Sequence, residues 1–327
     1  MSKSFGLQLL QQKPLTDPKV SFAGKTVIVT GSNSGLGFEA AAKFVALDAS
    51  RVILGIRDAE KGSAARRAIE ERTGREGHAE VWQLDMNSYD SIRAFADRAS
   101  RLDRLDVALL NAGVYMVDYQ KSLYGWEETL QVNTISTALL SLLLLPKLRS
   151  SCTELSLPVL EFVSSRRAEA AVLPATEGSI LEALNDQSQF SPSVQYRSSK
   201  LLAMCIAQKL AASVQSSEVA VTAVCPGAAA SNLSRGWSGF IPNMLKAILN
   251  ALFMRTTEEG ARSLVSGTTL GSEGHGKFWY DDQVHSLLPP TVTEDIAAKV
   301  WTEVLGALQK DVGEDLDAML KRDAWSG

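Results

Sequence analysis

A glycine-rich segment at 30–37, TGSNSGLG, is the feature that most restricts how this chain can fold. It follows KTVIVT, a β-branched apolar run typical of a strand that is buried on both faces of a parallel sheet. It precedes FEAAAKFVALD, in which apolar residues recur at helical spacing. In this context Gly31 permits a tight turn, and Gly35 and Gly37 let the backbone approach a pyrophosphate at the positive end of the helix. The segment therefore predicts a nucleotide-binding loop.

The alternation of strand and helix continues along the chain. Further strand-like runs, with helical patterns between them, are RVILGI at 51–56, AEVWQLD at 79–85, LDVALLNAG at 105–113, PVLEFVSS at 158–165, VAVTAVCPG at 219–227 and HGKFWYDD at 275–282. This alternation predicts an α/β protein with a single-domain Rossmann fold: a doubly wound parallel sheet with helices on both faces. In such a fold, ligands bind at the carboxyl ends of the strands.

Composition argues against several classes of partner. Charged residues make up 21% of the chain and the net charge is -4, so there is no basic excess for nucleic acid and no polybasic run for a membrane surface. The three cysteines and three histidines lack the spacing of metal ligands, so no metal site is expected. Free thiols and the lack of a secretory signal pattern indicate a cytoplasmic protein.

The longest helical pattern is YGWEETLQVNTISTALLSLLLLPKL at 124–148. Its most apolar part, at 137–148, is shorter than the roughly 20 residues that a membrane-spanning helix needs. We therefore expect no membrane span and interpret this part as a buried helix that Pro146 and Lys147 close.

The end of the second strand, LGIRD, bears on the choice of cofactor. An acidic residue there would bind the adenosine ribose hydroxyls and repel a 2′-phosphate. Arg57 occupies that place instead, and a guanidinium pairs well with a phosphate. Asp58 is expected to cap the next helix, which Gly74 would end. The sequence thus favours NADP(H) over NAD(H), with a solvated loop charge as the alternative interpretation of Arg57.

Tyr196 and Lys200, in QYRSSK, are four residues apart. One helical turn would bring both side chains to the same face, roughly 6 Å apart. The spacing alone is weak evidence, because tyrosine and lysine are common enough for a chance match. The pair becomes informative only together with the motifs that surround it.

These motifs together resemble the short-chain dehydrogenase/reductase family. After the glycine turn come LDM at 84–86, LNAG at 110–113, Asn133 in LQVNT, VSS at 163–165, Tyr196-x3-Lys200 and Pro226-Gly227, in the family's order and strand contexts. The resemblance covers about residues 22–285. KTVIVTGSNSGLGFEAA and VILGIRDAEKG are most similar to the branch that contains retinol-dehydrogenase-like enzymes and fungal secondary-metabolism reductases.

The resemblance implies a proton-transfer role for Tyr196 and Lys200. Tyr196 would be the general acid in ketone reduction and the general base in alcohol oxidation. A phenol ordinarily has a pKa near 10, and the ammonium of Lys200 would lower this pKa by favouring the phenolate. Lys200 would also hydrogen-bond the ribose of the nicotinamide.

The same resemblance implies that Ser165 donates a hydrogen bond to the substrate oxygen, where negative charge grows. Ser164 is the alternative, but the family places the catalytic serine three residues before Gly or Ala, and Ala168 satisfies this rule for Ser165. Asn133 would distort its helix locally and hold a water of the proton relay. The alternative is an asparagine on a helix face with no role.

Cofactor contacts are expected wherever a strand ends near the glycine turn. Asp85 would lie near the adenine, and Asn111 with Gly113 beneath the cofactor. Ser231 stands where threonine is usual and keeps the hydroxyl. The full set is Gly31, Ser32, Asn33, Ser34, Gly35, Leu36, Gly37, Arg57, Asp85, Met86, Asn111, Ala112, Gly113, Tyr196, Lys200, Pro226, Gly227 and Ser231.

The chain departs from simpler members of the family between Ser165 and Tyr196. The 30 residues at 166–195 are expected to form an insertion over the active site that shapes the substrate pocket. Arg166 and Arg167 are interpreted as solvated charges, with contacts to an acidic substrate as the alternative.

Residues 228–255 are predicted to be a substrate lid with an apolar face, which suits a hydrophobic substrate. An ordinary amphipathic helix packed on the core is the alternative. The other parts are an N-terminal extension at 1–24, the Rossmann domain at 25–290 and a C-terminal helical tail at 291–327. Further candidate pocket residues are Tyr115, Met116 and Tyr119.

The leading hypothesis is an NADPH-dependent oxidoreductase, a ketone or aldehyde reductase or an alcohol dehydrogenase, that acts on a hydrophobic small molecule of secondary metabolism. An isomerase, lyase or cyclase is the alternative, because an activated phenol also serves enolisation without net redox chemistry. A non-catalytic cofactor sensor would not need all four predicted catalytic residues. The oligomeric state is left open: the resemblance implies that two copies could pair as a homodimer through the helices at 124–148 and 194–216, and the alternative is that the C-terminal tail covers that face.

Overall fold

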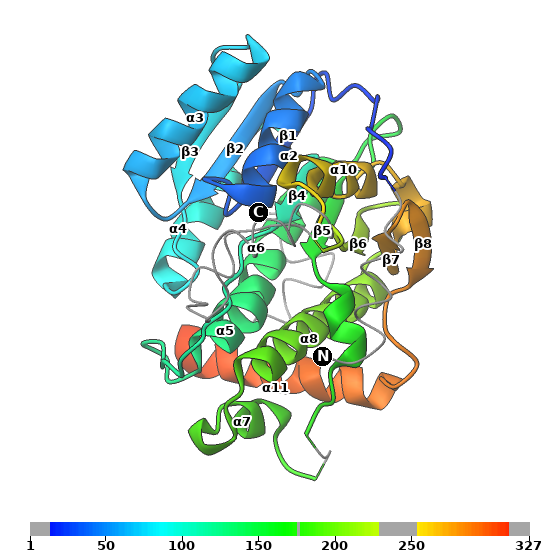
Figure 1. Ribbon diagram of the computed structural model, residues 1–327. Helices are drawn as coiled ribbons and strands as arrows, with labels where there is room; N and C mark the ends of the chain where they lie inside the picture. Colours follow the sequence, from blue (N-terminus) through cyan, green and yellow to red (C-terminus); the bar gives the residue numbers. More distant parts are fainter. Residues whose placement is uncertain (1–13, 175–176, 229–253, 314–327) are drawn as a thin grey trace.

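The structure, a computed structural model, describes residues 14–174, 177–228 and 254–313. Its centre is one eight-stranded sheet in the order β3-β2-β1-β4-β5-β6-β7-β8 (Figure 1). Strands β1 to β7 are parallel, and β8 is antiparallel to β7. The predicted α/β Rossmann fold is thereby confirmed. The strands are β1 (Thr26–Thr30), β2 (Arg51–Ile56), β3 (Ala79–Gln83), β4 (Val107–Leu110), β5 (Val159–Val163), β6 (Ala220–Val224), β7 (Lys277–Tyr280) and β8 (Gln283–Ser286).

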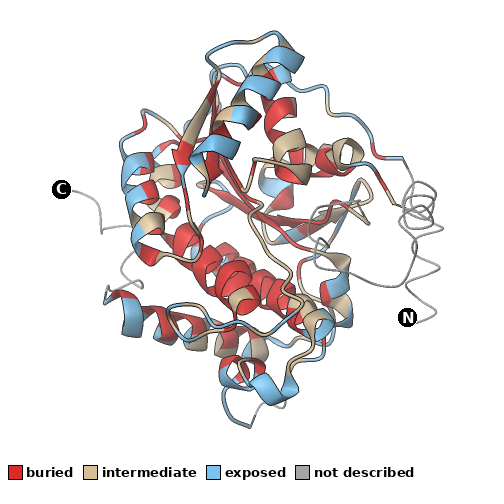
Figure 2. Cartoon of the chain, turned by 60° about the vertical axis from the view of Figure 1, so that its left-hand side comes forward, coloured by how far each residue is buried: buried red, intermediate tan, exposed pale blue. Residues whose placement is uncertain are grey.

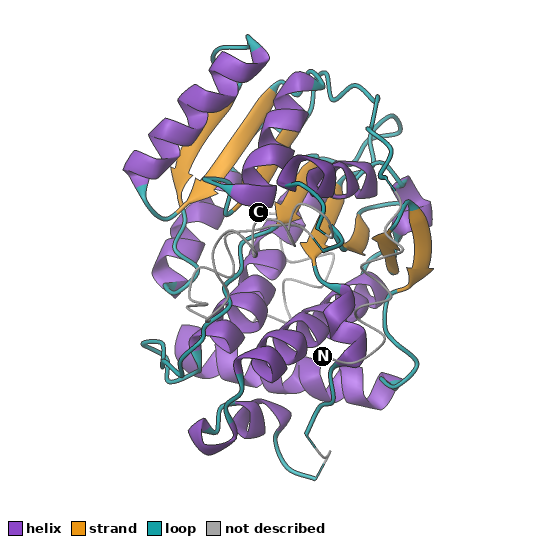
Figure 3. Ribbon diagram, viewed as in Figure 1, coloured by secondary structure: helices purple, strands orange, loops and turns teal. Residues whose placement is uncertain are grey.

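Helices cover both faces of the sheet (Figure 3). The buried residues of one face come from α2 (Gly35–Ala46), α3 (Ala59–Thr73) and α10 (Thr257–Gly267). Those of the other face come from α4 (Tyr89–Ser100), α6 (Thr137–Ser150) and α8 (Pro192–Ser213). The shorter helical segments are α5 (Glu128–Leu130), η1 (Gln131–Ser136), η2 (Arg166–Ala170), α7 (Ile180–Leu184), η3 (Gln187–Gln189) and η5 (Gly271–Gly274).

The central strands are buried on both faces, as their continuous apolar sequences predict. Every residue of β1, β5 and β6 is buried. Within β1, Val27 and Val29 pack under α2 whereas Ile28 packs on the opposite face, because successive side chains of a strand alternate in direction. Figure 2 shows the buried core running through the sheet and the helices next to it.

The predicted long helix is continuous from Glu128 to Ser150 through α5, η1 and α6. Among the described residues it is the one helix that is long and apolar enough to cross a membrane, but 89% of its most apolar window is buried in the protein. The apolar part of this helix is therefore longer than the leucine-rich run at 137–148, which was the only part compared with the length of a membrane span. The prediction that Pro146 closes the helix is also wrong, because the fully buried Leu148 holds a further turn against the core.

The C-terminal helix α11 (Glu294–Val312) packs along α8 and also contacts α7 and η1 (Figure 1). It thus contacts both of the helices through which two copies could pair, α8 most extensively and the long helix at η1. This favours the alternative that the C-terminal tail covers that face, and the homodimer stays a prediction. Residues 1–13, 229–253 and 314–327 lie outside the described residues, and so do Ser231 and most of the predicted lid.

A carboxyl group is buried in the middle of the sheet. Glu161 of β5 is completely buried, and neither of its carboxyl oxygens has a hydrogen-bond partner. Its side chain lies against Gly267 of α10, where a Cβ would come within 2.3 Å of Glu161 Oε2. Burial raises the pKa of Glu161 well above its ordinary value. Burial therefore favours the protonated, uncharged form of Glu161 in the folded protein.

We predict that Glu161→Gln stabilises the protein increasingly as the pH rises. Above the ordinary glutamate pKa the unfolded chain has lost this proton while the folded protein keeps it, so wild-type stability falls by up to about 1.4 kcal/mol per pH unit. Chemical denaturation at several pH values between about 5 and about 8 measures the difference. Glu76→Gln, at an exposed position, is the control. A difference that does not change with pH would contradict the prediction.

Candidate active site

The glycine turn lies where β1 passes into α2. Gly31 has a φ of 66°, and a Cβ on it would lie 2.9 Å from Ala112 Cα. A Cβ on Gly37 would lie 2.4 Å from Asn111 Nδ2 and 2.6 Å from the oxygen of Gly31. All three distances are shorter than the contacts that real Cβ atoms make, so only glycine fits at either position. These two glycines let the turn pack closely on itself and against the end of β4, whereas a Cβ on Gly35 would meet nothing within 4 Å, so the turn is open at Gly35.

The turn is joined to the end of β4. Asn111 Nδ2 donates to the oxygen of Thr30 at 2.8 Å, and the amide of Ala112 donates to Thr30 Oγ1 at 2.9 Å. Ser32 is completely buried and donates to the oxygen of Val29 at 3.0 Å, whereas Leu36 packs in the core. Of these predicted cofactor residues, Ser32 and Leu36 hold the turn with their side chains, and only their backbone can face a ligand. Asn33 and Ser34 are half-buried.

The side chain of Arg57 is exposed at the end of β2. No carboxylate of the described residues pairs with it. The neighbouring Asp58 caps α3 as predicted, accepting from the amides of Glu60 at 3.0 Å and Lys61 at 3.1 Å, and Gly74 ends the helix with a φ of 66°. The guanidinium of Arg57 is thus available beside the glycine turn.

The predicted adenine-side residues follow β3. Asp85 is half-buried, and its Oδ1 accepts from the amide of Asn87 at 3.0 Å. Met86 is buried. The structure places both at the carboxyl edge of the sheet, next to the end of β2.

Asn133 lies in the π-helix η1, the local helix distortion that the resemblance implied. Its Oδ1 accepts from the amide of Val114 at 2.8 Å, and its Nδ2 donates to the oxygen of Val114 at 2.9 Å. The same Nδ2 donates to Ser199 Oγ at 3.0 Å, and this hydroxyl donates to the oxygen of Tyr196 at 2.9 Å. Asn133 therefore joins the loop after β4 to α8. Ser199 was not expected from the sequence.

Tyr196 and Lys200 share one face of α8, and Lys200 Nζ lies 5.9 Å from the centroid of the Tyr196 ring. Lys200 Nζ also donates to the oxygen of Val163 at 2.9 Å. A Cβ on Gly113 would lie 3.3 Å from this Nζ and 3.0 Å from Asn133 Oδ1. The structure thus brings Gly113, Asn133 and Lys200 together with Tyr196.

The protonation of the pair differs from the prediction. Burial lowers the pKa of Lys200 to about 8. Although part of the Tyr196 side chain is exposed, its burial is sufficient to raise its pKa to about 12, with a smaller lowering by Arg167. Desolvation outweighs the predicted effect of Lys200 on Tyr196. At neutral pH Tyr196 is therefore a neutral phenol that can donate a proton, and Lys200 is mainly charged.

Ser165 and Ser164 have different surroundings. Ser164 is buried, and its Oγ donates to the oxygen of Lys200 at 3.4 Å. Ser165 is half-buried at the start of η2, and its Oγ accepts from the amide of Arg167 at 3.2 Å. The hydroxyl hydrogen of Ser165 is thus still available for a ligand. The geometry favours Ser165, as the position of Ala168 does.

The end of β6 closes the site. Pro226 is buried, and Gly227 has a φ of 79°. Cys225 is a buried thiol, as expected, and its Sγ accepts from the amides of Arg166 at 3.4 Å and Gly227 at 3.3 Å. Only one feature of the sequence could have placed Cys225 at the site: it directly precedes the Pro-Gly pair.

The predicted insertion is fixed at several points. At α7, Glu303 of α11 accepts from Ser179 Oγ at 2.9 Å and from the amides of Ile180 at 3.1 Å and Leu181 at 2.9 Å. The interpretation of Arg166 as a solvated charge is wrong, because it pairs with Asp281 at 3.4 Å. A guanidinium this close to a carboxylate is not free for an acidic substrate.

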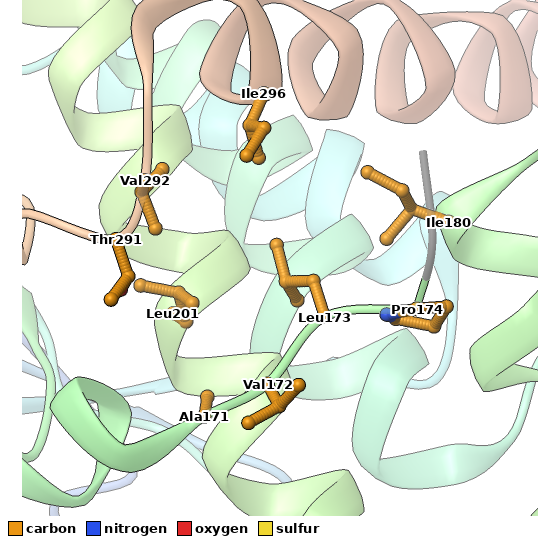
Figure 4. Close-up of a pocket in the computed structure, with 9 residues that line it drawn as sticks. All are labelled: Ala171, Val172, Leu173, Pro174, Ile180, Leu201, Thr291, Val292 and Ile296. Atoms are coloured by element: carbon orange, nitrogen blue, oxygen red, sulfur yellow. The ribbon is translucent and has the colours of Figure 1, made fainter. Parts of the chain in front are cut away.

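The insertion and α11 enclose an apolar pocket of about 450 Å³ (Figure 4). Leu201 contributes from α8, but it is about 140° around the helix from Tyr196. The pocket therefore lies against the outer side of α8. Its lining residues are Ala171, Val172, Leu173, Pro174, Ile180, Leu201, Thr291, Val292 and Ile296.

Comparisons with known proteins identify the family of this chain. Residues 25–153 match the family model of short chain dehydrogenases. The chain is 42% identical to the short-chain dehydrogenase/reductase phmF of Phaeosphaeria nodorum, over 94% of this chain and 93% of that protein. It is 41% identical to the short-chain dehydrogenase/reductase ffsI of Aspergillus flavipes, over 95% and 93%. The chain belongs to the short-chain dehydrogenase/reductase family. The predicted resemblance is confirmed.

Solved structures agree with the short-chain dehydrogenase/reductase fold. An uncharacterized protein from Mycobacterium paratuberculosis matches with a TM-score of 0.63 and 26% identity, over 90% of this chain and 98% of that one. Pseudomonas aeruginosa RhlG, in an active-site complex with NADP, matches with a TM-score of 0.62 and 21% identity, over 86% and 100%. In the described ranges, no cluster of three or more His, Cys, Asp or Glu side chains could hold a metal ion.

As a short-chain dehydrogenase/reductase, this chain is an oxidoreductase that uses a nicotinamide cofactor. The residues present fit that group. The turn is open at Gly35, where a Cβ would meet nothing within 4 Å, and Gly113 lies directly against Asn133 and Lys200. The exposed guanidinium of Arg57 lies at the end of the next strand.

We predict that carbonyl reduction slows as the pH rises through about 8. Lys200 loses its proton there, whereas Tyr196 keeps its own up to about 12. The pH dependence of kcat/KM measures this, and Lys200→Met should show no such transition. A wild-type rate that is constant up to about pH 10 would contradict the assignment.

Proposed function

We propose that this enzyme transfers hydride between NADP(H) and the carbonyl or alcohol carbon of a hydrophobic small molecule, in fungal secondary metabolism. The observation that carries the proposal is the convergence of Asn133, Tyr196 and Lys200 at the carboxyl edge of the sheet, beside the glycine turn. A cofactor sensor without activity would have no use for this arrangement.

The side chains divide the reaction between them. When bound, the nicotinamide supplies the hydride. Ser165 donates to the carbonyl oxygen as negative charge grows on it. Tyr196, a neutral phenol, gives its proton to the same oxygen, and the ammonium of Lys200 stabilises the phenolate that remains. In alcohol oxidation the same groups act in reverse.

The supporting observation for NADP(H) is the pair of neighbouring residues at the end of β2. Asp58 caps α3 and pairs with Lys61 at 3.3 Å, so its carboxylate is engaged with the helix, whereas the neighbouring Arg57 is exposed. A guanidinium without a carboxylate partner in the described residues can pair with that phosphate in two hydrogen bonds.

We predict that Arg57→Ala raises KM for NADPH by about tenfold or more and changes KM for NADH by less than about twofold. Steady-state kinetics with both cofactors measures the two effects. Arg67→Ala is the matched control, because Arg67 is also an exposed arginine but lies on α3. Equal effects on NADPH and NADH would show that Arg57 does not contact the phosphate.

Aromatic side chains near Tyr196 support a hydrophobic substrate. The rings of Tyr115 and Tyr196 have centroids 5.3 Å apart. Tyr119 meets Phe190, from the end of the insertion, edge to face with centroids 5.5 Å apart. Tyr119 also donates to the oxygen of Asn185 at 2.8 Å, which fixes the insertion beside this aromatic group. These rings would form one wall of the substrate site.

We predict that NADPH deuterated at the transferred hydrogen leaves its label in the product of a hydrophobic carbonyl compound. Tyr196→Phe should lower kcat by at least about 10²-fold, because it removes the proton donor and keeps the ring. A panel of ketones, aldehydes and quinones, followed by mass spectrometry, measures both. A product without label, formed without loss of NADPH, would identify an isomerase, lyase or cyclase instead.

A further inference from the structure

A two-residue turn joins β7 to β8 next to the active site. Tyr280 pairs with Gln283, so Asp281 and Asp282 are the loop residues. Both have positive φ, 51° and 54°, which defines a type I′ turn. Such turns favour Asn-Gly and Asp-Gly, so an aspartate at the position of Asp281 suits the turn. The turn does not account for the contacts that the carboxylate of Asp281 makes.

The carboxylate of Asp281 joins two arginines from distant parts of the chain. Its Oδ1 accepts from Arg255 Nη2 at 2.8 Å, and its Oδ2 accepts from Arg166 Nη1 at 3.4 Å. The side chain of Arg255 is only 3% exposed. Charge-assisted hydrogen bonds to a buried guanidinium are strong, and Asp281 is the closer of two carboxylates at Arg255, the other being Glu259 at 3.9 Å.

Arg166 connects Asp281 to the predicted catalytic serine. It directly follows Ser165 in the loop at 165–170, which we call the serine loop. Its guanidinium lies over the ring of Tyr280, 4.7 Å from the centroid. Holding this side chain at Asp281 therefore restricts where the serine loop can lie.

Arg255 connects Asp281 to the segment after β6. Its Nη1 donates to the oxygen of Pro226 at 3.5 Å, and its backbone amide donates to the oxygen of Ala228 at 2.8 Å. These contacts hold residues 226–228, which we call the Pro-Gly segment. Cys225 Sγ, which accepts from the amides of Arg166 and Gly227, is a second and weaker link between the same two regions.

We propose that Asp281 is a positioning residue that fixes the serine loop relative to the Pro-Gly segment. Its consequence for the reaction rests on the proposed function. Ser165 would hold the carbonyl oxygen and the Pro-Gly segment would hold the nicotinamide, so Asp281 aligns the hydride acceptor with the donor. Small misalignments at this point slow hydride transfer strongly.

Asp281→Asn tests the proposal, with Asp282→Asn as the matched control. Asparagine tolerates positive φ, so both variants keep the turn and each loses one charge. Asp282 differs in its partner, since its Oδ2 accepts from the exposed amide of Thr16 at 2.8 Å. An effect of the lost charge or of a weakened turn should therefore appear in both variants. An effect on the contacts between the serine loop and the Pro-Gly segment should appear only in Asp281→Asn.

The first measurement is hydrogen–deuterium exchange with NADPH present and no substrate. In Asp281→Asn we expect exchange about tenfold faster than in the wild type in peptides that cover the serine loop and the Pro-Gly segment, with β1 unchanged. Asp282→Asn should match the wild type in these peptides. Equal exchange in the two variants would overturn the proposal, whether or not the enzyme reduces any carbonyl compound.

The second measurement is the primary isotope effect on kcat, with NADPH deuterated at the transferred position and 9,10-phenanthrenequinone as the probe. Misalignment slows hydride transfer, so Asp281→Asn should show a lower kcat and a larger isotope effect than the wild type. A merely unstable variant would have fewer active molecules with an unchanged isotope effect. Faster exchange with an unchanged isotope effect would overturn the alignment role.

The two measurements distinguish a failure of the proposed function from a failure of the proposed role of Asp281. A wild-type enzyme that consumes no NADPH with any carbonyl compound would contradict the proposed function, while the exchange data still decide the role of Asp281. If Asp281→Asn does not fold, Arg166→Gln replaces it, because Arg166 is partly exposed and its loss breaks the link between Asp281 and the serine loop but leaves the pair of Asp281 with Arg255. The serine loop should then exchange faster while the Pro-Gly segment does not, and no change in either would overturn the proposal.

Discussion

The parallel direction of strands β1 to β7 is the constraint on which the whole site depends. Parallel strands need long crossover connections, and all of their carboxyl ends lie at one edge of the sheet. The glycine turn, Asn111, Ser165 and Pro226 follow four of these strands and meet there, although they are far apart in the sequence. Burial on both faces fixes the register, because a slip by one residue would move every side chain to the opposite face, where the packing suits other residues.

Burial also decides the protonation of the reacting groups. Lys200 is held by the oxygen of Val163 and close to Asn133, and it keeps most of its charge at neutral pH. Tyr196 stays neutral under the same desolvation, so the pair suits proton donation to an oxygen that gains charge. Around this centre, Glu303 of α11 and Asp281 of the last hairpin fix loops that come from distant parts of the chain.

Most of the fold and the central site residues followed from local patterns. Apolar strands, helical spacing and the cap at Asp58 depend on neighbours in the sequence, and the structure confirms them. The errors share one cause. Pro146 does not end its helix, Arg166 is not solvated, and Lys200 does not set the pKa of Tyr196, since each outcome depends on burial or on a residue far away in the chain. Such effects leave no trace in a local pattern.

The sequence by itself determined the α/β class, the glycine turn and the family, because these rest on the residue types and spacings that the backbone requires. Tertiary structure alone decided which serine hydroxyl is available, how Asn133 joins the loop after β4 to α8, and which side chains hold the insertion. It also placed Asp281 between two arginines. Hydrogen bonds and desolvation act over a few ångströms in space, so only the folded chain brings their partners together.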